Sequence, residues 1–326
     1  MRISLITPAA AHARSGNRNT ATRWARMLRE LGHRVEIEQE WSGGRSELMI
    51  ALHARRSADS IARYAKTFPE RPLVVVLTGT DLYRDIQFDH SAQRSLGLAT
   101  RLVVLQDRAL KELASTMRSK TRVIYQSARS IQRVQPLASF YEIVVSGHLR
   151  TEKDPFRAAA ALGFLPASSR ARVTHVGGAL SKGMAREARA WMKREPRYRW
   201  LEEVPRWRAL QILARSRLMI VSSLMEGGAN VICEALAAGV PVIASRIGGN
   251  VGMLGAAYPG YYAVGNERAL ARLISQAERD EHYYQALESV CASRAPLVLP
   301  EREKAALEAL IAELTMRRRV RARAAA

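Results

Sequence analysis

The chain has 326 residues, and 51 Lys and Arg against 30 Asp and Glu give it a formal net charge of +21. Its 48% hydrophobic content is that of a globular protein and excludes a disordered chain, and because no run approaches about 20 apolar residues we expect no transmembrane segment. The basic residues are spread along the chain, apart from a cluster at Arg317–Arg323, and no zinc, helix-turn-helix or RNA-binding signature accompanies them, so we expect no nucleic-acid partner.

Short apolar runs alternate with longer amphipathic ones through the first half of the chain. We predict strands at residues 3–7, 35–38, 47–53, 72–78, 102–106 and 122–125, and helices at residues 20–31 and 57–66. A loop is expected from His12 to Asn19. The wholly apolar stretch Leu73–Leu77 is typical of a strand that is buried on both faces. This alternation predicts a parallel sheet covered by helices.

The alternation starts afresh near Phe140. We predict strands at residues 141–146, 172–176, 200–203, 218–222 and 241–245, and helices at residues 155–162, 182–194, 206–214, 230–238, 267–278 and 301–316. The polar stretch from Gln126 to Ser139 separates the two series. We therefore expect an α/β protein with two Rossmann-like doubly wound domains, residues 1–135 and 136–326, that face a central cleft. The last helix can cross back.

Neither a metal nor a redox cofactor is required by the residues present. Cys233 and Cys291 are the two cysteines, and neither has a metal-ligand or Cys-x-x-Cys spacing. The chain also contains no Asp-x-Asp motif. We expect a cytoplasmic enzyme that needs no cofactor and whose partners are small-molecule substrates.

The main candidate for a binding site follows the strand at residues 218–222. Gly227 and Gly228 leave the backbone open to a ligand, and the helix that starts near Asn230 would direct its free N–H groups at a phosphate. Glu226 and Glu234 are about two helical turns apart, and their carboxylates can accept hydrogen bonds from sugar hydroxyls. The alternative interpretation is an ordinary helix entry with one acidic residue.

This stretch continues through Gly239-Val240-Pro241-Val242 to Gly248-Gly249. The whole pattern resembles the donor domain of retaining GT-B glycosyltransferases of the glycogen-synthase-like family, the family 4-like group. The resemblance implies a nucleotide-diphosphate sugar as donor, with Glu226 beside the sugar and Glu234 at the ribose hydroxyls. It also implies that a run of backbone meets the sugar and the phosphates, namely Gly227, Gly228, Ala229 and Asn230.

The segment from Val144 to Asp154 resembles the first strand and loop of the same donor domain. Family members usually carry Arg where His148 stands, whereas Lys153 matches the family. A fixed cation can stabilise the diphosphate as it leaves, so Lys153 is the candidate for that role, and Arg150 is the candidate to replace the missing Arg. A solvated loop charge is the alternative for Arg150. The turn Gly177-Gly178 is a weaker match to a glycine-rich turn that faces the donor.

The first half is expected to hold the acceptor. The loop after the first strand is rich in arginine and small polar residues, which suits an anion, and two further strands end in polar residues at the same sheet edge. For Arg55 and Arg56, the start of a surface helix is the alternative interpretation. The candidate acceptor-binding residues are Gly16, Asn17, Arg18, Thr20, His53, Arg55, Thr80 and Asp81.

Three segments of the first half, Ser15–Ala21, Ala51–Ala58 and Leu77–Tyr83, resemble the selenosugar synthases of bacterial selenoneine biosynthesis, and the similarity extends over nearly the whole chain. It implies that selenophosphate attacks the anomeric carbon of UDP-N-acetylglucosamine (UDP-GlcNAc) or UDP-glucose and that UDP leaves. Two alternatives stay open at this point. One is an ordinary GT-B family 4-like glycosyltransferase with a carbohydrate, lipid or thiol acceptor, and the other is a UDP-sugar epimerase of the same fold.

Overall fold

The structure is a computed structural model that describes residues 1–13 and 15–324, with only the backbone from residue 317 onward. Arg14 of the predicted acceptor loop and the side chains of the basic cluster Arg317–Arg323 lie outside this description. The chain divides into two compact units. Unit 1 combines Met1–Gln126 with the C-terminal segment that begins at Pro300, and unit 2 comprises Ser127–Leu299. Among the described helices, none has the length and apolarity needed to cross a membrane.

Unit 1 is built on a six-stranded parallel sheet with the strand order β2-β1-β3-β4-β5-β6. The wholly apolar strand at Leu73–Leu77 is buried along its length, because helices cover both faces of the sheet. The strands are β1 (Arg2–Ile6), β2 (Arg34–Glu38), β3 (Leu48–Leu52), β4 (Leu73–Leu77), β5 (Arg101–Val104) and β6 (Thr121–Val123).

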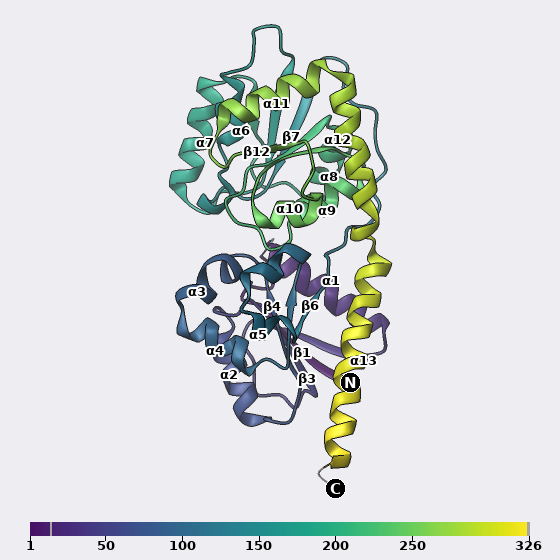
Figure 1. The fold of residues 1–326 in the computed structure, drawn as a ribbon. Coiled ribbons are helices and arrows are strands. Elements are labelled where there is room, and N and C mark those ends of the chain that lie inside the picture. Colours follow the sequence, from purple (N-terminus) through teal and green to yellow (C-terminus); the bar gives the residue numbers. More distant parts are fainter. Residues whose placement is uncertain (14, 325–326) are drawn as a thin grey trace. The chain divides into compact units, whose positions relative to one another are not determined.

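Two helices pack on one face of this sheet and two on the other. Trp24 of α1 and Leu310 of α13 share a core with Leu5 of β1. Tyr64 of α2 and Leu96 of α4 share the opposite core. Figure 1 shows α13 running beside the strands of unit 1. The helices of unit 1 are α1 (Gly16–Glu30), α2 (Ala58–Thr67), α3 (Ile86–Phe88), α4 (His90–Leu98), α5 (Ser115–Arg118) and α13 (Pro300–Ala324).

Helix α1 begins earlier than the sequence pattern predicts. The expected loop from His12 to Asn19 is wrong in its second half, because the Ser15 hydroxyl caps the helix by accepting a hydrogen bond from the Arg18 N–H group at 3.3 Å. The predicted acceptor residues from Gly16 to Thr20 therefore lie on the first helical turns.

Helix α13 is tied to the rest of unit 1 by ionic contacts. The Glu303 carboxylate accepts hydrogen bonds from the Trp24 indole at 2.6 Å and from Arg23 at 2.8 Å. Farther along, Glu313 pairs with Arg101 and Arg122 at the edge of the sheet. At the other end of unit 1 the chain leaves after Gln126, whereas the sequence places the boundary at residue 135.

The stretch after Gln126 belongs to unit 2 because its backbone is hydrogen-bonded there. Ala128 N–H donates to the Val298 carbonyl at 3.0 Å, and Ile131 N–H donates to the Ala237 carbonyl at 3.3 Å. This stretch forms no regular element, which is why the sequence offers no periodic pattern to assign it.

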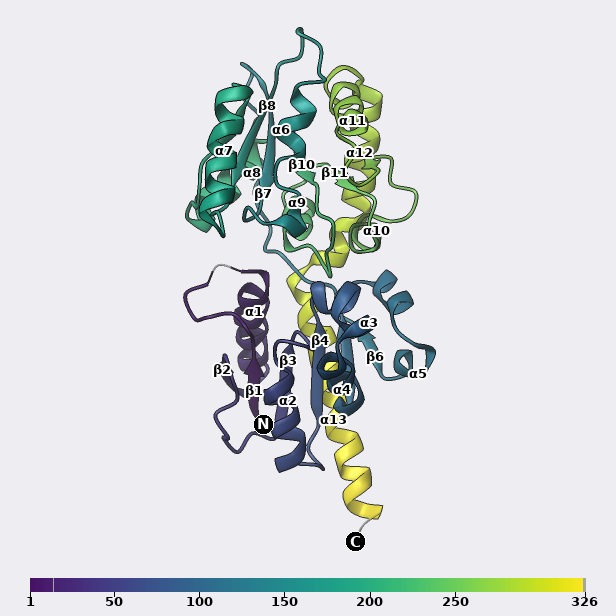
Figure 2. The same ribbon diagram turned by 90° about the vertical axis from the view of Figure 1, so that its left-hand side faces the viewer.

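Unit 2 repeats the architecture with the strand order β12-β11-β10-β7-β8-β9, again all parallel, and Figure 2 shows helices on either side of the sheet. The strands are β7 (Tyr141–Ser146), β8 (Ala171–Val176), β9 (Tyr198–Trp200), β10 (Leu218–Val221), β11 (Val242–Ser245) and β12 (Tyr261–Tyr262). The helices are α6 (Arg157–Leu162), α7 (Lys182–Arg194), α8 (Arg206–Arg215), α9 (Asn230–Ala237), α10 (Gly248–Leu254), α11 (Glu267–Arg279) and α12 (Glu281–Arg294).

Each sheet has one point where the strand order reverses. In unit 2, β7 and β10 are neighbours, and the later strands extend outward from them in opposite directions. In unit 1 the corresponding neighbours are β1 and β3. Open parallel sheets bind ligands outside the carboxyl ends of the strands at such points, because the adjoining loops separate and leave a crevice. The loops after β7, β10, β1 and β3 are therefore the places to look for a site.

Candidate functional site

The loop after β7 lies against the turn after β8. Gly147 N–H donates to the Val176 carbonyl and Leu149 N–H donates to the Gly178 carbonyl, both at 2.9 Å. Gly177 has φ +144°, and a Cβ atom there would lie 2.1 Å from the Gly147 carbonyl oxygen. The glycine at position 177 is thus required by this close backbone contact, whether or not a ligand is bound.

His175 supports the same loop from beneath. Its Nε2 atom lies 3.1 Å from the Gly147 carbonyl oxygen, which can only accept, so Nε2 carries the proton. Nδ1 is then the acceptor for the Tyr198 hydroxyl at 2.9 Å. Burial lowers the pKa of His175 to about 4, because the charged imidazolium would lose its hydration. The ring is therefore neutral and holds Gly147 with one defined tautomer.

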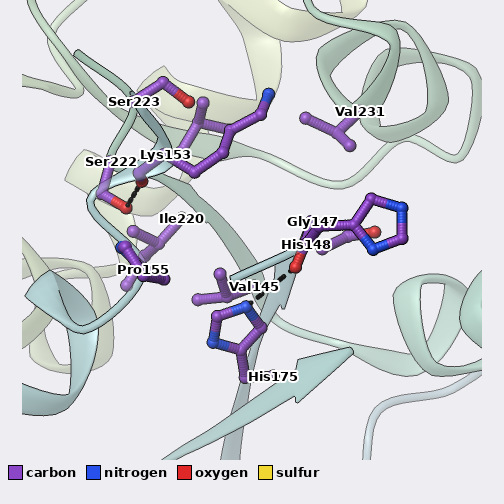
Figure 3. A pocket seen from close by; sticks show the side chains of 12 residues that line it. Val145, Gly147, His148, Lys153, Pro155, His175, Ile220, Ser222, Ser223 and Val231 are labelled. Atoms are coloured by element: carbon purple, nitrogen blue, oxygen red, sulfur yellow. Dashed lines mark hydrogen bonds between the residues drawn. The ribbon is translucent and has the colours of Figure 1, made fainter. Parts of the chain in front are cut away.

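A small pocket opens at the reversal point of unit 2, and Figure 3 shows its lining side chains. The loop after β7 contributes Gly147, His148 and Lys153, and the end of β10 contributes Ser222 and Ser223. The predicted residue Arg150 does not line this pocket. It begins the short turn Thr151–Lys153, and its guanidinium makes no hydrogen bond or ion pair with the part of the chain that the structure describes.

Lys153 and Glu226 form an ion pair that joins the two loops. The same Glu226 oxygen accepts a hydrogen bond from the Ser223 hydroxyl at 2.6 Å. The Glu226 side chain is 10% exposed and that of Lys153 is 21% exposed, so the pair is largely shielded from water. Lys153 lines the pocket, whereas Glu226 lies behind it and is not among its lining residues. The two predicted residues are thus brought together, and Ser223, which the sequence analysis did not single out, completes the cluster.

The backbone beneath this ion pair is fixed as well. The Ser222 hydroxyl lies 2.9 Å from both the Lys153 and the Asp154 carbonyl oxygens, and Figure 3 shows the first of these contacts. Leu224 N–H donates to the Glu152 carbonyl at 2.9 Å. These bonds fix the backbone of Lys153 against the end of β10. The Lys153 side chain therefore extends from a fixed point.

The segment after Glu226 is buried up to the start of α9. Gly227, Gly228 and Ala229 are all buried, and Ala229 occupies the N-cap position, where it has no side chain that can bond the first helical N–H groups. Such uncapped N–H groups at a helix start can receive an anionic oxygen. The phosphate contact of this segment and of Asn230, the first residue of the helix, stays a prediction.

Glu234, predicted to bind ribose, has a partner that sequence reasoning missed. Its carboxylate lies 2.7 Å from the guanidinium of Arg206 on α8. The Glu234 side chain is 14% exposed and that of Arg206 is 59% exposed. The contact joins α8 to α9 across many residues of sequence, so no local pattern indicates it. A ligand at Glu234 would meet a carboxylate that is already partly neutralised.

In unit 1 the Asp81 carboxylate holds two loops together. One oxygen accepts from the Thr78 and Gly79 N–H groups at 2.9 Å, and the other accepts from the Ala54 N–H group at 2.9 Å. The residue is fully buried. Asp81 therefore fixes the loops after β3 and β4, and its oxygens serve the backbone.

His53 follows β3 with a left-handed backbone, φ +74°, which is uncommon for a residue other than glycine. Its Nδ1 accepts from the Arg56 N–H group at 3.2 Å, so its Nε2 carries the proton and donates to the Thr80 hydroxyl at 3.0 Å. Burial lowers the pKa of His53. The predicted pair His53 and Thr80 is thus brought into direct contact.

The remaining acceptor candidates differ in how accessible they are. Gly16 is exposed, Asn17 and Arg18 are half-buried, and Thr20 points inward, where it donates to the Gly16 carbonyl and accepts from Gln126.

Arg55 is 44% exposed and lies 3.6 Å from the buried Asp85, a residue that the sequence analysis did not identify. Across the described residues, no group of three or more His, Cys, Asp or Glu side chains is arranged to hold a metal ion.

Comparison with known proteins agrees with this architecture. HepE of Anabaena, solved in complex with UDP and glucose, superposes with a TM-score of 0.75 at 18% identity over 97% of this chain and 99% of that chain. Sucrose-phosphate synthase from Thermosynechococcus elongatus gives 0.79 at 16% identity, again over 97% and 99%. A glycosyltransferase from Rickettsia africae gives 0.66 at 15% identity over 95% and 98%.

These likenesses establish the fold, the GT-B fold, in which each of the two units is built on a parallel α/β sheet. No curated protein matches the sequence. The family model for glycosyl transferases group 1 matches residues 129–292, half of the chain, and this match covers the loops after β7 and β10. The chain therefore belongs to the glycosyl transferases group 1 family.

Proposed function

We propose that this chain transfers the sugar of UDP-GlcNAc or UDP-glucose to selenophosphate, forming a C–Se bond and releasing UDP. The observation that carries the donor half is the cluster of Lys153, Glu226 and Ser223 at the reversal point of unit 2, beside the uncapped start of α9. The acceptor half is supported by the arginines Arg18 and Arg55 near the loops of unit 1 and by the resemblance of these loops to selenosugar synthases.

The donor half follows from what a nucleotide-diphosphate sugar requires. As the bond from the anomeric carbon to the diphosphate breaks, negative charge accumulates on the leaving oxygen, and a fixed cation stabilises it. Lys153 is fixed by its backbone contacts and paired with Glu226. The helix start at Asn230 would receive a phosphate oxygen, and Glu234 would receive the ribose hydroxyls. HepE, whose fold this chain shares, was solved with UDP and glucose.

The acceptor half follows from charge. Selenophosphate is an anion, and the start of α1 combines the positive end of a helix dipole with the half-buried Arg18. Arg55 adds a second cation after β3. The selenium atom would attack the anomeric carbon while the bond to UDP breaks, and water would then cleave the Se–P bond to release phosphate. Selenium is already a strong nucleophile, so the step needs alignment more than a general base.

The test is a panel of acceptors with UDP release as the common readout. We expect UDP release from UDP-GlcNAc or UDP-glucose to depend on selenophosphate and to be slow with inorganic phosphate, free sugars or small thiols. Turnover of a carbohydrate, lipid or thiol acceptor without selenophosphate dependence would instead identify an ordinary glycosyltransferase. Interconversion of UDP-sugars without any acceptor would identify an epimerase.

A further inference from the structure

A line of buried hydrogen-bonded residues connects α10 and the end of β11 to Glu226. The Asn250 side-chain amide donates to the Ser245 carbonyl at 2.9 Å and reaches the Ser245 hydroxyl at 3.1 Å. The Ser245 hydroxyl donates to the Ser223 carbonyl at 2.6 Å, and the Ser223 hydroxyl donates to Glu226. The line thus passes from α10 through the end of β11 to the loop after β10.

The direction of every bond in this line is determined by chemistry. A carbonyl oxygen can only accept, so the atom of Asn250 that faces the Ser245 carbonyl must be the nitrogen. Because that nitrogen can only donate, the Ser245 hydroxyl proton is left for the Ser223 carbonyl. Ser245 thus holds the Ser223 main chain, and the hydroxyl of the same Ser223 donates to Glu226.

The residues of this line are buried, and one of their polar atoms lacks a hydrogen bond. Asn250 and Ser245 are fully buried, and Ser223 is 2% exposed. The Oδ1 atom of Asn250 is buried and has no hydrogen-bond partner among the residues that the structure describes. A buried unpaired acceptor is unfavourable, and an apolar side chain would fill the same space without that cost. The contacts that Asn250 makes here are those of its nitrogen, to the carbonyl and the hydroxyl of Ser245.

Backbone packing confines Glu226 from the same direction. A Cβ atom at Gly249 would lie 1.9 Å from the Glu226 carbonyl oxygen, so the start of α10 touches the Glu226 backbone directly. The Glu226 main chain is limited by this contact, while its carboxylate is limited by Ser223 and Lys153.

We infer that Ser245 and Asn250 are positioning residues that orient the Glu226 carboxylate through Ser223, and this inference rests on the proposed function. Neither residue touches the pocket itself. Their removal would leave donor binding nearly intact and would let the Glu226 carboxylate depart from its reactive orientation. Such losses of alignment reduce the rate of the chemical step more than they weaken substrate binding.

The experiment compares Ser245→Ala with a matched buried serine. Ser216 is equally buried in the same unit, and its hydroxyl also donates to a backbone carbonyl, that of Ile212 at 2.7 Å, but it forms no part of the line. UDP binding is measured by calorimetry, and kcat and KM are measured from the release of UDP from the donor, with water as acceptor and with selenophosphate. We expect Ser245→Ala to lower kcat about 10- to 100-fold with donor KM changed by less than about twofold.

Two further variants make the result specific. Ser245→Thr keeps the hydroxyl and should restore most of kcat, whereas Ser216→Ala should leave kcat within about twofold of wild type. Asn250→Leu removes the amide without leaving a buried polar atom at that position, and it should lower kcat while UDP binding persists, which provides a second route if Ser245→Ala does not fold.

Equal kcat in wild type and the Ser245 and Asn250 variants would overturn the inference, as would an equal loss in Ser216→Ala. A wild type that neither binds UDP nor releases it from a donor would refute the proposed function itself, and the inference with it. The calorimetric result separates these two failures, because the inference alone fails only when the wild type binds UDP and turns over.

Discussion

Replacing His175 with Gln should make the free energy of unfolding less sensitive to acid. The buried His175 ring stays neutral in the folded protein, whereas the same ring takes up a proton when the chain unfolds. The ring lies between the Gly147 carbonyl and the Tyr198 hydroxyl, and its burial lowers its pKa from 6.5 to about 4. Between these two values the unfolded chain binds a proton that the folded chain does not, so stability falls as the pH decreases from 6.5 toward 4 and is unaffected above 6.5. At about pH 5 this linkage is worth roughly 2 kcal/mol.

Urea unfolding at about pH 7.5 and about pH 5, followed by tryptophan fluorescence, measures this linkage, because the Trp200 indole donates to the Gly177 carbonyl beside the same loop. His175→Gln keeps an amide donor for Gly147 and cannot titrate. We expect the wild type to lose about 2 kcal/mol more than the variant on acidification, since their other titrating groups are the same and cancel in the difference. An equal loss in the two proteins would refute the neutral state of the buried ring.

Four other substitutions test separate parts of the structure. Lys153→Ala should lower kcat about 100- to 1,000-fold in the UDP-release assay, because the leaving diphosphate loses its cation, and retained activity would remove Lys153 from the mechanism. Glu234→Ala should raise the donor KM by about tenfold or more, and an unchanged KM would exclude its contact with ribose. Arg18→Ala should raise the KM for selenophosphate and leave the donor KM unchanged, and the reverse pattern would contradict the assignment of the acceptor to unit 1. Glu313→Ala should lower the free energy of unfolding by about 3 kcal/mol, because the buried Arg101 loses its carboxylate, and a change below about 1 kcal/mol would show that solvent replaces the pair.

The parallel α/β architecture was predictable from the sequence because it depends on local periodicity. Leu73–Leu77 is apolar at every position, which suits a strand that is covered on both faces, and the structure buries it on both. The start of α1 was less predictable, because the side chain of Ser15 decides it and the hydrophobic pattern begins later. The helices at His90–Leu98 and Glu281–Arg294 were missed for a related reason, since their polar faces obscure the apolar periodicity.

The candidate site was predictable only where its residues follow one another in the chain. Glu226 and Lys153 belong to short motifs, so each was found alone, but their ion pair joins loops that are far apart in sequence. Ser223, Ser245 and Asn250 have no distinctive pattern, and their importance arises from contacts that tertiary structure creates. Sequence reasoning therefore identified Lys153, Glu226 and Glu234 one by one and missed the partners, both charged and neutral, that tertiary structure brings to them.

The most direct test of the central claim is identification of the product by mass spectrometry after incubation with selenophosphate and a UDP-sugar labelled in the sugar ring. The account predicts a labelled sugar that carries one selenium atom at its anomeric carbon, formed in equal amount with UDP. Label found only in free sugar, in an epimeric UDP-sugar or in a selenium-free glycoside would contradict it.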